Sequence, residues 1–394
     1  MEDKRLKVAY FLESLVAFGG VERVLTDKAN YMAIYFDYDV YIITCAQNPK
    51  QQNAFLLHES VEQVNLDVPY YEQYHYGYPK RLLVKRKIEK LIRQRLSEAI
   101  KIIDPDILIG VTHFEANLIS TIPCRAKKVI ESHEARPFTM SGMSQYRNIL
   151  SNIYMKFYRQ VYLRTIERHA DVVVSLTEGD AHEWRKSRRV EVIPNFSLMP
   201  ISEYCNCDTK RVIAAGRLSW EKGYDRLLSV WEIVSKKHPD WCLDIFGNGN
   251  LQESLEETIQ NMQLQNVTIH PPVKEIGHEY ASSSICVLTS YFEGFALVLL
   301  ESLRHGLPCV AFDCKFGPRS IIDDGSCGYL VEDGNIELFA ERVCNLIEFE
   351  NKRMQFSLMA VEHARKFDVY GTMTRWKTLF ESLAFGVTPE ERKK

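Results

Sequence analysis

The chain has 394 residues, which exceeds what one ordinary hydrophobic core accommodates and favours two domains. Hydrophobic residues make up 46% and charged residues 26%, values that are ordinary for a globular enzyme. The net charge of -3 gives no reason to expect a nucleic acid as partner.

The spacing of the cysteines bears on metal binding, and the N-terminal residues bear on the cellular compartment of the protein. The ten cysteines are scattered without Cys-x-x-Cys spacing, which resembles neither a disulfide framework nor a zinc site. The chain opens directly into an apolar strand without a signal-peptide pattern, and no apolar run approaches the roughly 18 residues of a membrane-spanning helix. We therefore expect no metal site, and a cytoplasmic protein or one attached at most to the inner membrane surface.

Short β-rich apolar runs alternate with longer helical patterns along the whole chain, which predicts parallel sheets covered by helices. The strands expected in the first half are Leu6–Leu12, Val40–Thr44, Ile107–Val111, Lys128–Glu131 and Val172–Leu176. Those expected in the second half are Arg211–Ala215, Cys242–Phe246, Val267–His270, Ile285–Leu288 and Cys309–Ala311. Helices are expected at Tyr224–Lys237 and Leu297–Arg304, among others.

The first strand leads into a glycine pair, Gly19 and Gly20, and then into a helix from about Val21. Glycines between a first strand and its helix let the backbone approach a ligand closely, although such a pair often only forms the turn between the two elements. Both interpretations stay open at this point.

Residues 80–101 form an amphipathic pattern in which nine Lys or Arg side chains stand against Glu89 and Glu98. One interpretation is a surface helix whose apolar stripe packs on the sheet. The other is docking on anionic lipid, where each cation near the surface contributes about 1 kcal/mol. A second aromatic and basic helix, Tyr146–Arg168, is expected to extend the same face.

Two histidines follow strands of the first half, His113 after Ile107–Val111 and His133 after Lys128–Glu131. They are competing candidates for a site at the carboxyl edge of the sheet, although an isolated histidine is usually structural. Asp104-Pro105-Asp106 formally matches a metal-binding Asp-x-Asp pattern. We expect it instead to cap the turn into the next strand.

In the second half, strand Arg211–Ala215 ends in Gly216 and is followed by Arg217 and Lys222. This arrangement brings two cations to the carboxyl edge of a sheet, where doubly wound folds bind ligands. Arginine offers a planar fork for phosphate oxygens and lysine a compact charge. Taken alone, the segment would suit a solvated basic loop better than a ligand site.

A second loop follows strand Ile285–Leu288 and carries Glu293 and Gly294 before a helix that contains Glu301. The amides after Gly294, those of Phe295, Ala296 and Leu297, can point at an anion from a helix N-terminus. Eight residues of helix cover about 12 Å, so the two carboxylates fit opposite ends of a long ligand. The alternative makes Glu293 a partner of the helix dipole and Glu301 an exposed surface residue.

These elements together resemble the retaining glycosyltransferases of family four, which have the GT-B fold. The resemblance is dense from about residue 211 to 335 and looser before it. The motifs that carry it are Arg217 with Lys222, Glu293-x7-Glu301, Phe316-Gly317-Pro318, Ile321-Ile322, Asp324-Gly325, Gly328-Tyr329-Leu330-Val331 and Gly247-Asn248-Gly249.

The resemblance implies a role for each candidate residue. Arg217 and Lys222 would neutralise the donor diphosphate, and Glu293 would hold hydroxyls of the transferred sugar. Glu301 would bind the ribose, and the segment around Val273 would lie along the base. The glycine loop of Gly19 and Gly20 would border donor and acceptor, and His133 would lie near the transferred sugar. Further donor-binding positions are Gly216, Gly247, Gly294, Phe295, Ala296 and Leu297.

The sequence therefore predicts an α/β protein of GT-B fold with two facing Rossmann-like, doubly wound domains. We expect an acceptor-side domain over 1–195, a donor-binding domain over 196–370, and a helix and tail over 371–394 that cross back to the first domain. The expected activity is retaining transfer of a hexose or N-acetylhexosamine from a nucleoside-diphosphate sugar, with UDP the expected nucleotide, to a glycan or lipid-linked acceptor.

The expected reaction needs neither a metal nor a cofactor. Fixed cations and a helix N-terminus stabilise the departing diphosphate instead. The alternatives are a non-hydrolysing UDP-sugar epimerase of the same architecture and a non-enzymatic nucleotide-sugar-binding protein. A Rossmann dehydrogenase is disfavoured because no Gly-x-Gly-x-x-Gly follows the first strand.

Overall fold

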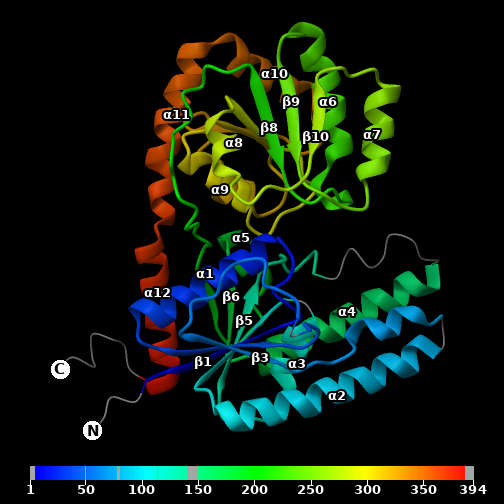
Figure 1. Ribbon diagram of the computed structural model, residues 1–394, viewed down its shortest axis with the longest axis vertical. Coiled ribbons are helices and arrows are strands. Elements are labelled where there is room, and N and C mark those ends of the chain that lie inside the picture. Colours follow the sequence, from blue (N-terminus) through cyan, green and yellow to red (C-terminus); the bar gives the residue numbers. More distant parts are fainter. Residues whose placement is uncertain (1–4, 49, 78–79, 113, 140–148, 387–394) are drawn as a thin grey trace. The chain divides into compact units, whose positions relative to one another are not determined.

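The computed structural model describes residues 5–48, 50–77, 80–112, 114–139 and 149–386. The chain divides into two compact units: the first comprises Met1–Pro194 with Tyr370–Lys394, and the second comprises Asn195–Val369. Each unit is built around one parallel sheet (Figure 1). His113 lies outside the described residues, as do Tyr146–Asn148 at the start of the second predicted basic helix.

The first unit contains a seven-stranded parallel sheet of order β3-β2-β1-β4-β5-β6-β7. Its strands are β1 Lys7–Leu12, β2 Asp39–Thr44, β3 Val61–Asn65, β4 Ile107–Val111, β5 Lys127–Ser132, β6 Val172–Ser175 and β7 Val190–Val192. Its helices are α1 Gly20–Tyr35, η1 Tyr70–His75, α2 Lys80–Ile103, α3 Phe114–Thr121, α4 Ile149–His169, α5 Glu178–Glu183 and α12 Val369–Phe385.

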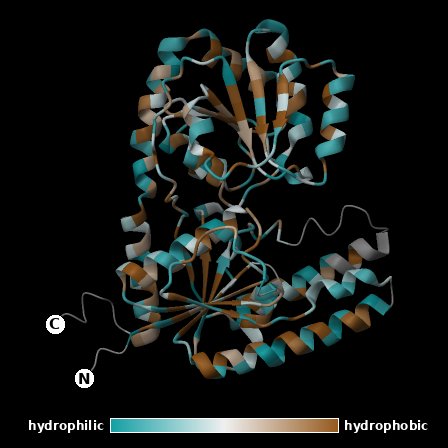
Figure 2. Ribbon diagram, viewed as in Figure 1, coloured by the Kyte–Doolittle hydropathy of each residue, from teal (hydrophilic) through white to brown (hydrophobic). Residues whose placement is uncertain are grey.

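Helices cover both faces of this sheet, as a parallel sheet requires. One face packs on α2, α3 and α4 through a large apolar cluster that includes Phe11, Ile92 and Trp184. The predicted apolar stripe of α2 is buried from Ile88 to Ile103, so packing on the sheet, the first interpretation, is confirmed for this part of the helix. Hydrophobic residues are concentrated in the strands (Figure 2).

The second unit contains a six-stranded parallel sheet of order β10-β9-β8-β11-β12-β13. Its strands are β8 Arg211–Ala215, β9 Cys242–Phe246, β10 Val267–His270, β11 Ile285–Leu288, β12 Cys309–Phe312 and β13 Gly328–Val331. Its helices are η3 Trp220–Lys222, α6 Tyr224–Lys237, α7 Gln252–Asn261, α8 Gly277–Ala281, α9 Leu297–Arg304, η4 Pro318–Ser320, α10 Ile336–Glu348, α11 Glu350–Ala364 and η5 Arg365–Phe367.

Strand order reverses once in each sheet, between β1 and β4 in the first and between β8 and β11 in the second. Such a reversal separates the loops on either side and creates the crevice where doubly wound folds bind ligands. Every strand expected from the sequence is present to within one residue at each end. The sequence reading missed the strands β3, β7 and β13, which lie at the edges of the two sheets.

Candidate active site

The loops that follow β8 and β11 flank the strand-order reversal of the second unit, and they are bonded to each other. The hydroxyl of Thr289 donates to the carbonyl of Gly223 at 2.9 Å, and the amide of Tyr291 donates to the carbonyl of Glu221 at 2.9 Å. The ring of Tyr291 stacks on Trp220 with centroids 4.8 Å apart. The two segments therefore form one wall at the carboxyl edge of the sheet.

A glycine makes this contact possible. Gly223 has φ of 63°, in the left-handed region, and it ends η3 immediately before α6. A Cβ atom at this position would clash with the carbonyl oxygen of Thr289. A side chain at position 223 would therefore both strain the backbone and push the two loops apart.

The structure brings Lys222 and Glu293 into direct contact. The ammonium of Lys222 lies 2.7 Å from Oε1 of Glu293, and the hydroxyl of Ser290 donates to the same oxygen at 2.7 Å. The side chain of Glu293 is only 9% exposed and that of Lys222 24%. The second oxygen of Glu293, Oε2, makes no hydrogen bond to any described residue, so it remains available as an acceptor.

Arg217 differs from Lys222 in having no side-chain partner among the residues that the structure describes. It is exposed, and its guanidinium makes neither an ion pair nor a hydrogen bond within the described part of the chain. Gly216 before it is fixed at the strand end: its amide donates to the carbonyl of Phe246, and its own carbonyl accepts from the hydroxyl of Tyr224. An unpaired cation on an anchored loop is suited to an anionic ligand.

The turn after Glu293 leads into α9, whose N-terminus has no side-chain cap. Gly294 is half-buried, Phe295 and Ala296 are buried, and Leu297 is the first residue of the helix. A third loop closes over this turn, because a Cβ atom on Gly317 would meet the side chain of Glu293 at 2.6 Å. The uncapped end of α9 thus lies directly after the carboxylate that Lys222 holds, as the sequence predicts.

Glu301 lies in α9 with only 6% of its surface exposed, so the alternative of an exposed surface residue is wrong. Burial, together with the negative charge of Glu301, raises the pKa of Tyr280 on α8 well above its usual value. The buried carboxylate of Glu301 thus interacts with Tyr280 within the protein.

Two further predicted donor-binding positions lie after neighbouring strands. Gly247 follows β9, and a Cβ atom there would clash with the carbonyl oxygen of Gly216, so only glycine fits so close to the β8 loop. Val273 lies in the loop after β10 with 39% of its surface exposed. No described contact joins Val273 to the Lys222–Glu293 pair.

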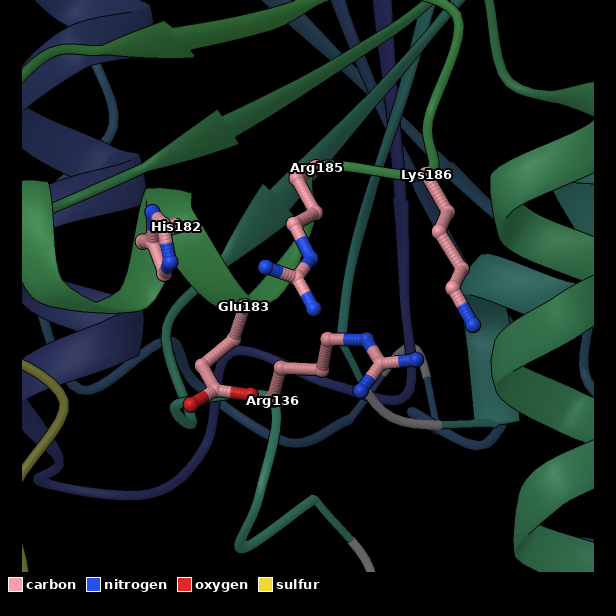
Figure 3. Close-up of a pocket in the computed structure, with 5 residues that line it drawn as sticks. All are labelled: Arg136, His182, Glu183, Arg185 and Lys186. Atoms are coloured by element: carbon pink, nitrogen blue, oxygen red, sulfur yellow. The ribbon is translucent and has the colours of Figure 1, made fainter.

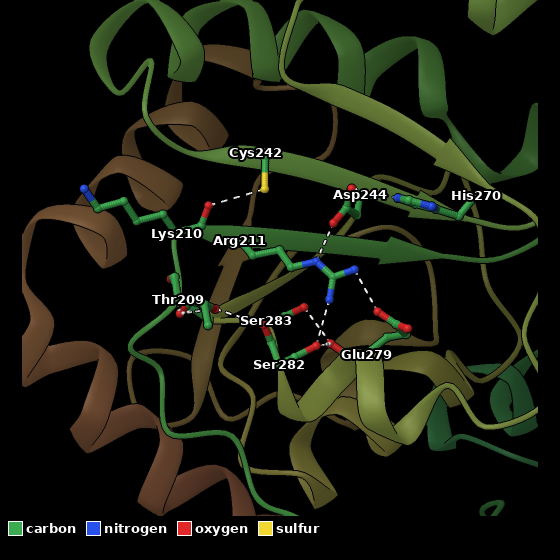
Figure 4. Close-up of polar contacts among 10 residues, drawn as sticks. Thr209, Lys210, Arg211, Cys242, Asp244, His270, Glu279, Ser282 and Ser283 are labelled. Atoms are coloured by element: carbon green, nitrogen blue, oxygen red, sulfur yellow. Dashed lines mark hydrogen bonds and ion pairs between the residues drawn. The ribbon is translucent and has the colours of Figure 1, made fainter.

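A separate polar cluster lies on one face of the same sheet (Figure 4). Arg211 begins β8 and binds Asp244 on β9 as well as Glu279 on α8, the latter at 2.7 Å. His270 completes the cluster, with Nε2 2.9 Å from the second oxygen of Asp244. Since Arg211 already has both carboxylates as partners, this cluster is structural.

In the first unit, His133 lies just beyond β5 in a buried cluster of ionisable groups. Its Nε2 is 2.8 Å from Oε2 of Glu131, and the same oxygen receives the ammonium of Lys28 from α1. The ammonium also lies 4.5 Å from the ring centroid of Trp376 on α12. The side chains of Lys28 and Glu131 are 2% and 0% exposed.

The charges of this cluster follow from burial and pairing. Burial alone would raise the pKa of Glu131, but the Lys28 ammonium and the bond from His133 prevail and lower that pKa to about 2. Burial lowers the pKa of His133, and the neighbouring carboxylate only partly opposes it. At pH 7 the imidazole is therefore neutral. Because Glu131 can only accept, His133 carries its proton on Nε2 and leaves Nδ1 as an acceptor.

Gly19 and Gly20 form the start of α1 on the other side of the strand-order reversal in this unit. Gly19 is the N-cap and Gly20 the first helical residue, and no side chain caps this end. Asp104 and Asp106 both bind Arg125, and Asp106 also accepts from the amide of Lys7 at 3.1 Å. The Asp-Pro-Asp segment is therefore structural, as expected.

Sequence reasoning identified His133 but missed its partners Glu131 and Lys28, although a signal was available for Lys28. Lys28 occupies the apolar face of α1 together with Val24, Leu25 and Met32, where a solvated lysine is not expected. Within the described ranges, no group of three or more His, Cys, Asp or Glu side chains is suited to hold a metal ion. None of the helices there is long and apolar enough to cross a bilayer.

Comparison with known proteins identifies two family profiles. "Glycosyltransferase Family 4" matches residues 18–196, and "Glycosyl transferases group 1" matches residues 205–362. A Haemophilus influenzae protein named "Uncharacterized glycosyltransferase" is 26% identical over 383 residues, which cover 94% of this chain and 99% of that protein.

A second relative has a higher sequence identity over part of the chain, and a solved structure shares the fold at low identity. The amylovoran biosynthesis glycosyltransferase AmsD of Erwinia amylovora is 36% identical over 221 residues, which cover 53% of this chain and 62% of AmsD, less than two thirds of its length. The crystal structure of S. aureus TarM is 15% identical, with a TM-score of 0.76 over 96% of this chain and 100% of that one. With consecutive profiles over both units and this shared architecture, the chain is a group 1, family 4 glycosyltransferase with the GT-B fold.

Proposed function

We propose that the protein is a retaining glycosyltransferase that transfers a hexose or N-acetylhexosamine from a nucleoside-diphosphate sugar to a glycan or lipid-linked acceptor. The observation that carries this proposal is the ion pair of Lys222 and Glu293, which lies near Arg217, a cation without a partner in the described part of the chain. Cations for a diphosphate and a carboxylate for sugar hydroxyls thus stand next to each other. A nucleotide sugar needs both within the length of one ligand.

Departure of the nucleoside diphosphate is the step that these cations serve. The bond between the anomeric carbon and the phosphate oxygen breaks, and negative charge develops on the leaving diphosphate. Arg217, Lys222 and the uncapped N-terminus of α9 stabilise this charge, which accelerates the reaction because the charge is larger in the transition state than in the ground state. In this mechanism no divalent ion is required.

Glu293 orients the transferred sugar. Its Oε1 is held by Lys222 and Ser290, so Oε2 accepts from a sugar hydroxyl. The carboxylate is an orienting group in this proposal, and no side chain acts as a covalent nucleophile. The acceptor oxygen attacks the face that the diphosphate leaves, its proton passes to a departing phosphate oxygen, and the anomeric configuration is retained.

Three residues complete the proposed contacts with the donor. Glu301 binds the ribose hydroxyls, and the segment around Val273 lies along the base. UDP is the proposed nucleotide, supported by the TarM structure, which contains UDP and α-GlcNAc-glycerol. His133, a neutral imidazole with Nδ1 as its free acceptor, is proposed to receive a hydrogen bond from a hydroxyl of the transferred sugar.

The proposed acceptor class includes lipid-linked glycans, and two basic helices support a membrane-facing surface. Helices α2 and α4 contact each other in the first unit, where the ammonium of Lys85 on α2 lies 5.4 Å from the ring centroid of Tyr158 on α4. On α4 the exposed apolar side chains Ile153, Phe157 and Val161 recur every four residues, so they share one face. Exposed cations accompany them: Lys156, Arg164 and Arg168 on α4, and Lys87 and Lys90 on α2.

Cations around an exposed apolar stripe are typical of surfaces that bind anionic lipid. We expect sedimentation with anionic vesicles, weakened by salt, and loss of most of it in Phe157→Ser with Lys87→Gln. The matched control is Lys236→Gln, an exposed lysine of the second unit. Equal binding to neutral vesicles, or none at all, would contradict this surface.

The donor site is tested by a thermal-shift screen against UDP-, GDP- and ADP-sugars, followed by turnover assays with the best ligand. Arg217→Ala and Lys222→Ala should each lower turnover about a hundredfold or more. Arg365→Ala, which removes an exposed arginine paired with Glu362, is the control. Near-normal turnover in both site variants would refute the assignment.

Two further experiments test metal independence and the epimerase alternative. Turnover that is lost on chelation and restored by magnesium or manganese would overturn metal independence. Incubation with a UDP-sugar alone tests the epimerase alternative, because an epimerase interconverts sugars without an acceptor.

A further inference from the structure

A small basic pocket lies in the first unit, outside the donor site (Figure 3). It has a volume of about 280 Å³ and is lined by Arg136, His182, Glu183, Arg185 and Lys186. Arg136 comes from the loop after β5, and the other four come from the end of α5 and the turn beyond it. The side chains of Arg136, Arg185 and Lys186 extend into the same space.

Three of the lining side chains have no partner among the described residues. His182, Arg185 and Lys186 are exposed and form neither an ion pair nor a hydrogen bond with other residues that the structure describes. Solvent-facing cations usually spread apart to reduce repulsion, and here two adjacent ones line the same pocket as a third. An oxyanion in the pocket would relieve the repulsion among Arg136, Arg185 and Lys186 and would accept hydrogen bonds from all three.

The floor of the pocket is rigid, unlike a loose group of surface lysines. The guanidinium of Arg136 donates through Nε and Nη2 to Oε1 of Glu167, at 3.1 and 2.7 Å, and lies 5.4 Å from the ring centroid of Trp184. Glu167 is 5% exposed and Trp184 is fully buried. Nη1 of Arg136 makes no hydrogen bond to a described residue, so one donor of a fixed guanidinium remains available.

A buried aspartate fixes the two segments to each other. Asp180 of α5 accepts from the amide of Arg136 at 2.6 Å and from the hydroxyls of Ser132 and Ser175 at 2.7 and 2.9 Å. The backbone of Arg136 is therefore fixed against α5 before a ligand arrives, which reduces the entropy lost when this residue binds.

The volume of the pocket and its acidic residue, Glu183, limit the kinds of ligand that it can bind. A volume of about 280 Å³ lies just below the range of roughly 300–1,000 Å³ of typical small-molecule sites, so it suits one phosphorylated unit and not an oligosaccharide. Glu183 has no ion-pair partner among the described residues, so its carboxylate can accept from a hydroxyl next to the anion.

We propose that this pocket binds a phosphate ester group of the acceptor through Arg136, Arg185 and Lys186. The proposal rests on the transferase function above and names a substrate feature for it. Arg136 follows His133 by three residues on the same loop, and Ser132 links that loop to α5 through Asp180. A phosphate held here would anchor the acceptor beside the histidine assigned to the transferred sugar.

The test measures binding of glycerol 3-phosphate to the full-length protein by calorimetry, with saturating UDP present to occupy the donor site. Arg185→Gln with Lys186→Gln should weaken binding about tenfold or more, since two charge-assisted hydrogen bonds are lost. The matched control, Arg188→Gln with Arg189→Gln, removes the same charge from the same turn but leaves the lining side chains intact. It should change the dissociation constant less than about twofold.

Farnesyl diphosphate serves as a second probe, because the phosphate could belong to a lipid carrier or to a soluble ester. The proposal is supported if either probe binds and only the Arg185→Gln/Lys186→Gln variant loses that binding. The probe that binds more tightly then shows whether the phosphate belongs to a lipid carrier or to a soluble ester. Equal losses in both pairs would show general charge attraction and overturn the proposal. Binding of glycerol as tight as that of glycerol 3-phosphate, or no binding of either probe, would also overturn it.

These outcomes are independent of the donor-site test. If Arg217→Ala and Lys222→Ala retain turnover, the proposed donor site fails while phosphate-ester binding can still localise to Arg185 and Lys186. If those variants are inactive but the phosphate esters do not bind, only the pocket assignment fails.

Discussion

The ammonium of Lys222 and the carboxylate of Glu293, which lie 71 residues apart in the chain, are 2.7 Å apart in space. The resemblance assigns one to the phosphate and the other to the sugar. Their contact couples the two assignments, because a change in one side chain alters the charge felt by the other. Donor phosphate and donor sugar are thus expected to be recognised together.

This coupling predicts a non-additive effect of mutation. Lys222→Met and Glu293→Gln should each lower kcat/KM about a hundredfold or more, and the double variant should fall well short of the product of the two losses. The measurement is a double-mutant cycle on kcat/KM with the preferred donor. Strict additivity would mean that the two side chains act independently in the transition state.

Gly223 gives a prediction on stability. Gly223→Ala should lower the free energy of unfolding by more than about 2 kcal/mol, because it adds left-handed strain of roughly 1–2 kcal/mol and a clash with the Thr289 carbonyl. Urea unfolding monitored by circular dichroism measures the change.

Gly334→Ala is the matched control for this experiment. Gly334 also has positive φ, 84°, but nothing lies within 4 Å of the position its Cβ would take. It should therefore show the backbone strain alone. Equal losses at both positions would mean that the loops after β8 and β11 separate without cost.

The buried pair of Lys28 and Glu131 predicts an asymmetry between single and double variants. Lys28→Met and Glu131→Gln should each destabilise the protein by about 3–5 kcal/mol, because each leaves the other charge buried without its partner. The double variant should recover part of that loss. The measurement is the free energy of unfolding at pH 7.

The exposed pair of Lys236 and Glu232 serves as control, since their nitrogen and oxygen are also 2.7 Å apart. Lys236→Met should change stability by less than about 0.5 kcal/mol. Chemical shifts of the His133 ring nitrogens add a readout of positioning. If the proton stays on Nε2 in Glu131→Gln with an unchanged pKa, the carboxylate does not set the tautomer.

Asp27 predicts a dependence of stability on pH. Burial raises the pKa of its carboxyl from 3.8 to about 6, and Arg23 at 4.0 Å opposes this only in part. The folded state therefore holds this proton more tightly than the unfolded chain does. Its contribution to stability is full below about pH 4 and is lost as pH rises through about 6.

Asp27→Asn should accordingly stabilise the protein at pH 7.5 by about 1–3 kcal/mol and flatten the slope of stability between pH 4 and 6. Urea unfolding across that range tests both effects. Glu59→Gln removes an exposed acid of the same unit and should stay within about 0.5 kcal/mol of the parent. A destabilised Asp27→Asn would mean that the carboxylate has a stabilising partner.

How much the sequence reveals depends on where a strand lies in its sheet. Central strands such as β4 and β11 are buried along their whole length and read as continuous apolar runs. The edge strand β3, Val-Glu-Gln-Val-Asn, has one buried residue, and its polar side chains conceal it among loops. The same holds for β7, which has three residues and none buried.

The sequence likewise predicts some parts of the candidate site and not others. Local spacing reveals Arg217, Lys222 and Glu293, because each follows a strand and carries a charge typical of ligand binding. Contacts across the chain have no local signature. Nothing near His133 in the sequence indicates that Lys28, 105 residues earlier, neutralises its neighbouring carboxylate. The Arg136 pocket likewise needs α5 packed beside β5.

The ring of Trp376, which lies over the Lys28 ammonium, has a consequence for synthesis of the chain. The second unit is one uninterrupted stretch, Asn195–Val369, and it can finish folding once that stretch has left the ribosome. The first unit must wait for α12 before its buried lysine is covered. The half of the protein made first is therefore the half completed last, and a nascent chain that stops short of α12 leaves that charge open to water.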